Sequence, residues 1–233
     1  MLRSETFYDR VIGQTLLAQN AKEREDHNPS GRLSAGSLGK PLQWQILHYL
    51  NVPGKEFDEY VLRKFTRGKD IESWFLFQVP NVVEQQKEVL YREVIGYVDA
   101  MVDTKDCDFN LGVIPCEIKS VTNMKYKHLS KQNTADRSHK LQAGLYALAT
   151  GSEHFCVNYI ASDDLRVLTY VFDTEDVKDE IDEIITRFDD QVAKQTVPLF
   201  EPVEKWQGKQ DYNDYPKYAS IVEEIPFDLI PKY

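Results

Sequence analysis

The chain has 233 residues, a formal net charge of −10 at pH 7, 42% hydrophobic residues and 28% charged residues. This composition is typical of a globular protein and excludes one that coats nucleic acid through bulk positive charge. No apolar run approaches the roughly 18 residues that a membrane span needs, and we expect no signal peptide and no membrane partner. Three scattered cysteines, Cys107, Cys116 and Cys156, are too few for a disulfide framework and favour a reducing, intracellular setting.

The first 55 residues are expected to form a segment of loops and short helices. The stretch from 26 to 40 is rich in Gly, Ser, Asn and Pro, which is typical of a loop. A short helix is predicted over 41–50, because Pro41 suits the first turn of a helix.

A longer helix is predicted over 56–77. Its apolar residues recur at near-helical spacing and would form the buried stripe: Phe57, Val61, Phe65, Ile71 and Phe75. Glu72 projects from or beside this stripe, where a carboxylate is unusual. It either snorkels to water at the rim of the core or serves as a metal ligand.

The rest of the chain alternates between strand and helix patterns. Residues 89–103 are expected to form two strands or one long bent strand, which pairs as a hairpin with a strand over 113–121. The elements predicted after these are a helix over 138–150, strands over 154–161 and 166–172, and a helix over 174–193. We therefore expect one α/β domain over 1–195, with its core over 56–195 and a central mixed sheet flanked by helices. Residues 196–233 would be an extended tail packed on the domain.

Two of the predicted strands carry acidic residues into an apolar setting. Glu117 and Lys119 lie two residues apart on one strand and therefore share a face, and Asp99 ends an apolar segment of the strand before it. A charge on such a strand costs free energy unless it has a partner. One explanation is a surface strand with a weak cross-strand salt bridge.

The other explanation is a metal-dependent catalytic site. Mg²⁺ and Mn²⁺ prefer oxygen ligands, which Asp99, Glu117, the Ile118 backbone carbonyl and Glu72 could supply. Lys119 could then orient a water molecule or stabilise the transition state of phosphodiester hydrolysis. On the predicted helix over 138–150, Gln142 and Tyr146 are four residues apart and share one face, so both could point at this site. Taken alone, this pair could equally be hydrogen bonding at the edge of the core.

Four motifs occur in an order that resembles the PD-(D/E)xK nuclease superfamily, specifically the branch similar to the RecB nuclease domain and the Cas4 exonucleases. These motifs are Glu72, Gly96-x-x-Asp99, Glu117-Ile118-Lys119 and Gln142-x-x-x-Tyr146. The resemblance runs from Ser34 to Phe172 and implies a restriction-endonuclease-like core with the order α-β-β-β-α-β. It also implies Mg²⁺- or Mn²⁺-dependent cleavage of DNA in the cytoplasm of a bacterial or infected host cell.

The resemblance assigns a role to each motif residue. Asp99 and Glu117 would be metal ligands, Lys119 the catalytic lysine, and Gln142 and Tyr146 an accessory pair near the scissile strand. Glu72 matches the helix position where this branch often places a His or Glu ligand. Cas4-like members also hold an iron–sulfur cluster with four cysteines, one early and three late. The cysteines of this chain do not match that pattern, so we expect no cluster and a compact, phage-type relative.

A narrow basic edge is expected to bind DNA. From Lys119 to Lys140 there are six basic residues against the single acid Asp136, although a solvated loop would look the same. The residues expected to contact phosphates are Arg32, Lys40, Lys125, Lys127, Lys131, Arg137 and Lys140.

The leading hypothesis is an exonuclease that acts on DNA ends or single strands, because no separate recognition domain is evident. One alternative is a catalytically silent subunit with a nuclease fold that binds DNA or a partner. Another is an RNA-cleaving relative. Beyond DNA, the expected partners are a recombination protein or a second copy of the chain.

Overall fold

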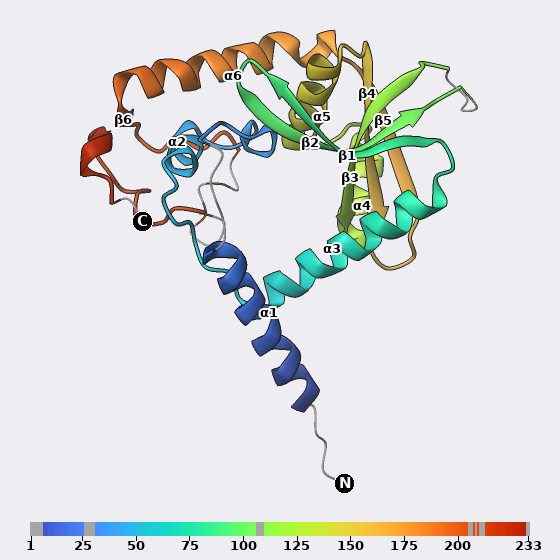
Figure 1. Cartoon of the computed structure of the whole chain (residues 1–233), viewed down its shortest axis with the longest axis horizontal. Helices are drawn as coiled ribbons and strands as arrows, with labels where there is room; N and C mark the ends of the chain where they lie inside the picture. The colour runs from blue at the N-terminus through green and yellow to red at the C-terminus, as the bar shows by residue number, and fades with distance from the viewer. Residues whose placement is uncertain are drawn as a thin grey trace.

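A five-stranded mixed sheet forms the centre of the protein (Figure 1). The structure is a computed structural model, and it describes residues 7–25, 31–105, 110–204, 207, 209 and 213–231. The strands are β1 (Val82–Tyr91), β2 (Val94–Asp103), β3 (Val113–Val121), β4 (His154–Ala161) and β5 (Val167–Asp173). They lie in the order β1-β2-β3-β4-β5. Only the β3–β4 pair is parallel, and the other three pairs are antiparallel.

Helices cover both faces of this sheet. The helices of the described chain are α1 (Phe7–Glu25), α2 (Leu42–Tyr49), α3 (Glu59–Gln78), α4 (Asn123–Gln132), α5 (Arg137–Thr150) and α6 (Glu175–Lys194). On one face, Ile71 and Phe75 of α3 pack in a core with Ala100, Ile118 and their neighbours. The larger core on the other face includes residues of α2, α4, α5 and α6. The predicted α/β class is confirmed, and α3, β1, β2, β3, α5 and β4 give the predicted order α-β-β-β-α-β.

Local sequence signals explain where several elements begin and end. Asp58 caps α3, because its side chain accepts a hydrogen bond from the backbone N–H of Val61 at 2.8 Å. The hairpin between β1 and β2 turns through Arg92 and Glu93, which both have positive φ, as tight hairpin turns require. Gln195 ends α6 in the left-handed conformation.

The structure corrects three predictions about helices. The stripe predicted for the helix over 56–77 is partly wrong, because Phe57 and Phe65 are 41% and 49% exposed and pack edge-to-face on each other. Leu62 is buried instead. The basic run after Lys119 contains the unpredicted helix α4, and the long helix α1 precedes the predicted loop. Figure 1 shows α1 extending away from the sheet, with α3 beside it.

Two cysteines form a disulfide, which runs against the expectation of free thiols in a reducing setting. Cys116 and Cys156 are register partners on the parallel strands β3 and β4, with Cα atoms 4.8 Å apart, and they are joined in a disulfide. Spacing along the chain could not show this pairing, because it depends on which strands become neighbours. Both residues are buried, as expected of small apolar side chains. Cys107 lies outside the described residues.

The described part of the C-terminal tail packs on the domain. Val197, Tyr215 and Ile230 join the larger core, and the two-residue strands β6 (Thr196–Val197) and β7 (Ile225–Pro226) pair with each other. Within the described ranges of the chain, none of the helices has the length and apolar character to cross a membrane.

Candidate active site

The β2–β3 pairing brings two of the predicted ligands together. Ala100 and Cys116 form the last pair of the antiparallel ladder, and Asp99 and Glu117 are the neighbours of this pair on the two strands. The carboxylate of Asp99 accepts a hydrogen bond from the backbone N–H of Ile118 at 2.8 Å. The Ile118 side chain packs in the core below α3. Asp99 is therefore held against the strand that carries the Glu117-Ile118-Lys119 motif.

Glu117 is a fully buried carboxylate with one oxygen left over. The Lys119 ammonium group donates to Glu117 Oε1, which confirms that these two side chains share a face of β3. Glu117 Oε2 is buried and has no hydrogen-bond partner of normal geometry, although the Tyr146 hydroxyl also acts on this carboxylate. Burial raises the pKa of Glu117 to about 7, although the positive charge of Lys119 opposes this shift. A buried acceptor without a partner is costly, so this oxygen points to a ligand.

Lys119 is surrounded by negative charge. Burial alone would lower its pKa, but the carboxylates of Glu117, Asp99 and Glu72 together raise it above its ordinary value. Its side chain keeps 30% of its surface exposed. Lys119 is therefore a charged ammonium group that joins the buried acid to solvent.

Glu72 of α3 completes the group of acids. Burial raises its pKa, and repulsion from Asp99 raises it further. Burial also raises the pKa of Asp99, which the Ile118 N–H, Lys119 and Gln86 partly offset. Gln86 of β1 donates to Glu72 Oε1 at 2.9 Å. Asp99 therefore lies close enough to repel both Glu72 and Glu117. The sequence did not single out Gln86.

The helix α5 brings the predicted accessory pair to the same site. Gln142 Nε2 donates to the Tyr146 hydroxyl at 2.7 Å, so the two side chains do share a helix face. Tyr146 is buried, and burial followed by the charge of Glu117 raises its pKa. One turn earlier, His139 lies 2.9 Å from the Tyr159 hydroxyl, and burial and the charge of Lys119 lower its pKa to about 4. His139 is thus a neutral imidazole beside the lysine.

The glycine of the Gly96-x-x-Asp99 motif is explained by Tyr146. A Cβ atom on Gly96 would lie 2.6 Å from the Tyr146 ring and 3.1 Å from Ala35 Cβ. We expect Gly96→Ala to displace Tyr146 and to lower the free energy of unfolding by about 1–3 kcal/mol. Chemical denaturation measures this, with Gly36→Ala as the control, because a Cβ there meets nothing within 4 Å. Equal stability of the two variants would contradict the close packing.

The donor set fits a divalent cation, although its groups are partly engaged with one another. Among the described residues, no three His, Cys, Asp or Glu side chains form a ready-made metal group. Glu117 contacts Lys119, and Glu72 accepts from Gln86. However, the free Glu117 Oε2 and the mutual repulsion of the acids are features that a cation would relieve.

Most of the predicted phosphate-binding residues are paired with acids. Five ion pairs occur: Arg32–Glu93, Lys40–Asp214, Lys125–Asp136, Arg137–Glu180 and Lys140–Asp176, with N···O distances from 2.6 to 3.7 Å. Lys127 and Lys131 are exposed on α4. Surface ion pairs contribute little free energy, so a phosphate could replace the acid in any of them. The charge of Lys125 acts on His139, which lies one turn before Gln142.

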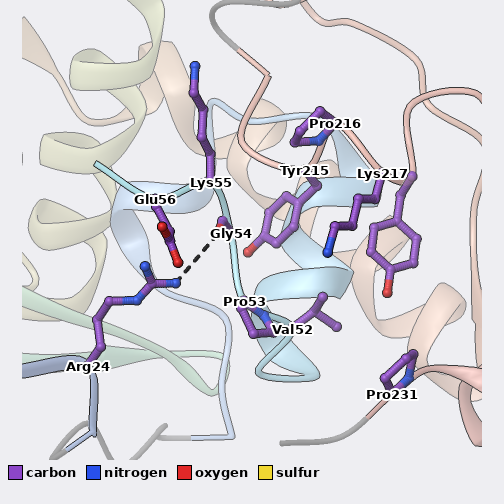
Figure 2. A pocket seen from close by; sticks show the side chains of 11 residues that line it. Arg24, Val52, Pro53, Gly54, Lys55, Glu56, Tyr215, Pro216, Lys217 and Pro231 are labelled. Atoms are coloured by element: carbon purple, nitrogen blue, oxygen red, sulfur yellow. Dashed lines mark hydrogen bonds between the residues drawn. The ribbon is translucent and has the colours of Figure 1, made fainter. Parts of the chain in front are cut away.

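The main cavities lie apart from the acids. Figure 2 shows a cavity of about 400 Å³ between the end of α2 and the tail, lined by Tyr215, Lys217 and Arg24, whose guanidinium group donates to the Gly54 carbonyl. A second cavity of about 470 Å³ is lined by Lys40 and Arg137, among others. Neither cavity is lined by Glu72, Asp99, Glu117 or Lys119.

Comparison with known proteins supports the fold. No protein-family model and no curated protein matches the chain. The solved structure of SSO0001 matches with a TM-score of 0.53 and 15% identity, over 87% of this chain and 93% of that chain. This likeness concerns the arrangement of the elements alone.

Two weaker structural matches are exonucleases. LHK-Exo, an alkaline exonuclease from Laribacter hongkongensis solved in complex with dAMP, has a TM-score of 0.47 and 11% identity, over 70% of this chain and 91% of that chain. A phage-related exonuclease from Haemophilus somnus 129PT has a TM-score of 0.46 and 11% identity, over 70% of this chain and 95% of that chain. At these scores, the function of this chain has to be argued from its own site.

Proposed function

We propose that the chain is a metal-dependent nuclease that hydrolyses phosphodiester bonds of DNA, most simply as an exonuclease acting on ends or single strands. The observation that carries this proposal is the buried Glu117 carboxylate, which contacts Lys119 through Oε1, is repelled by Asp99 and leaves Oε2 without a hydrogen-bond partner of normal geometry. Most buried oxygens of a structural salt bridge have a hydrogen-bond partner. The proposal also draws on the resemblance of the motifs to the RecB and Cas4 branch.

The residues divide into those that would hold a cation and those that would act on the phosphate. Asp99, Glu117 and the Ile118 carbonyl would hold Mg²⁺ or Mn²⁺, with Glu72 as a further ligand. Such a cation, when bound, lowers the pKa of water and neutralises charge on the scissile phosphate. No iron–sulfur cluster is needed for this chemistry.

Lys119 and the α5 residues would act on the substrate. The charged Lys119 ammonium group donates hydrogen bonds and can stabilise the negative charge that develops on a phosphate oxygen. Gln142 holds the Tyr146 hydroxyl in a fixed position beside Glu117. The basic residues of α4 and the start of α5 would bind the flanking phosphates.

The proposal is tested with a panel of end-labelled substrates. Linear, circular and single-stranded DNA, together with RNA, are incubated with the protein in Mg²⁺, Mn²⁺ or EDTA. We expect linear or single-stranded DNA to be degraded in either metal and to remain intact in EDTA. Cleavage of RNA alone would identify an RNA-cleaving relative. Binding of DNA without cleavage in any metal would identify a silent subunit and contradict the proposal.

A further inference from the structure

Gln86 has a backbone conformation that a strand residue rarely adopts. It lies within β1 with a φ of +50°, in the left-handed region that favours glycine. Gln85 pairs with Ala100 and Lys87 pairs with Val98, so Gln86 lies opposite Asp99. A non-glycine residue in this conformation costs about 1–3 kcal/mol, and such residues cluster at functional sites.

The partner strand is also irregular at this point. Residues two apart on a regular strand face the same side of a sheet. Val98 belongs to the core on the α5 side, whereas Ala100 belongs to the core on the α3 side. The regular alternation of β2 side chains between the two faces of the sheet is therefore broken at Asp99. This position lies directly opposite the unusual backbone of Gln86.

The Gln86 side chain uses this position to bridge two acids from different elements. Its amide donates to Glu72 Oε1 on α3 at 2.9 Å. The strand register places the same residue opposite Asp99 on β2, and its polar side chain lowers the pKa of that acid. An amide nitrogen carries two N–H donors and no charge, so it can serve two carboxylates at once. Without such a donor, two acids that repel each other would move apart.

We propose that Gln86 is a positioning residue that holds Glu72 and Asp99 side by side for a divalent cation. This inference rests on the proposed function. It assigns to β1, which carries none of the sequence motifs, a share in forming the site. Residues that orient metal ligands typically contribute 10–100-fold to metal affinity or activity.

The test is Gln86→Gly, since glycine accepts the positive φ and removes only the side chain. The matched control is Gln195→Gly, which makes the same change at an exposed glutamine with a φ of +56°. We expect the dissociation constant for Mn²⁺, measured by calorimetry, to rise about 10-fold in Gln86→Gly and to stay unchanged in the control. Unfolding of the two metal-free variants should differ little, and a tenfold higher Mn²⁺ concentration should restore DNA cleavage.

The outcomes separate this inference from the proposed function. If the wild type binds Mn²⁺ and cleaves DNA, and Gln86→Gly binds Mn²⁺ with the same affinity, the role of Gln86 is overturned and the proposed function stands. A Gln86→Gly variant whose cleavage defect persists at high Mn²⁺ while its affinity is normal also overturns it. A wild-type protein that binds no Mn²⁺ overturns both.

Discussion

Lys119→Met is expected to lower the rate of Mg²⁺-dependent DNA cleavage by about 10³-fold while the protein remains folded. The variant keeps the length of the side chain but removes its positive charge. Among the residues that the structure describes, this is the one charge in an ion pair with Glu117. The loss of one group that stabilises transition-state charge typically costs about 10²–10³-fold in rate. Single-turnover kinetics on end-labelled DNA, with circular dichroism as a check of folding, measure the effect.

The control for this variant is Lys178→Met on α6. Lys178 also forms an ion pair with a glutamate, Glu175, but the pair is exposed. We expect the Lys178→Met variant to cleave DNA at the wild-type rate. If Lys119→Met retained more than about a tenth of the wild-type rate, Lys119 would not be the catalytic lysine.

The second large effect concerns the stability of the metal-free protein. The pKa of Glu117 is about 7 in the folded state, against an ordinary value of 4.5. The folded state therefore binds its proton more tightly, and the stability that this proton provides is lost as the pH rises from 4.5 through 7. Between pH 5 and pH 8, we expect the wild type to lose about 2 kcal/mol more of its unfolding free energy than Glu117→Gln loses.

Urea denaturation in EDTA at the two pH values measures this difference. Addition of Mn²⁺ at pH 8 should stabilise the wild type, because a ligand that binds only the folded state raises its stability. Glu117→Gln should gain much less. The same pH dependence in both proteins would show that Glu117 does not carry the buried charge described above.

Short-range periodicity was enough to predict the centre of the site. The two-residue repeat of a strand placed Glu117 and Lys119 on one face, and the contact between them confirms this. The four-residue spacing on α5 placed Gln142 beside Tyr146, and their hydrogen bond confirms it. Both predictions needed only the geometry of a single element. The roles of these residues in catalysis stay predictions.

Features that depend on long-range pairing could not be predicted in this way. Gln86 reaches Asp99 only because β1 pairs with β2 in one register, and nothing in its neighbouring residues marks it. The Cys116–Cys156 pair likewise depends on the parallel contact of β3 and β4. The helix α4 was not predicted, because Leu129 is its one buried residue. Its sequence therefore shows no periodic apolar stripe. In contrast, helical spacing alone placed His139 one turn before Gln142.

Cleavage of linear end-labelled DNA by the wild type and by Glu117→Gln, in Mg²⁺ and in EDTA, tests the role of the acidic cluster most directly. If Asp99, Glu117 and Lys119 form a metal-dependent phosphodiesterase site, only the wild type in Mg²⁺ releases labelled nucleotides. Cleavage by the wild type that persists in EDTA, or cleavage by Glu117→Gln at the wild-type rate, would contradict it.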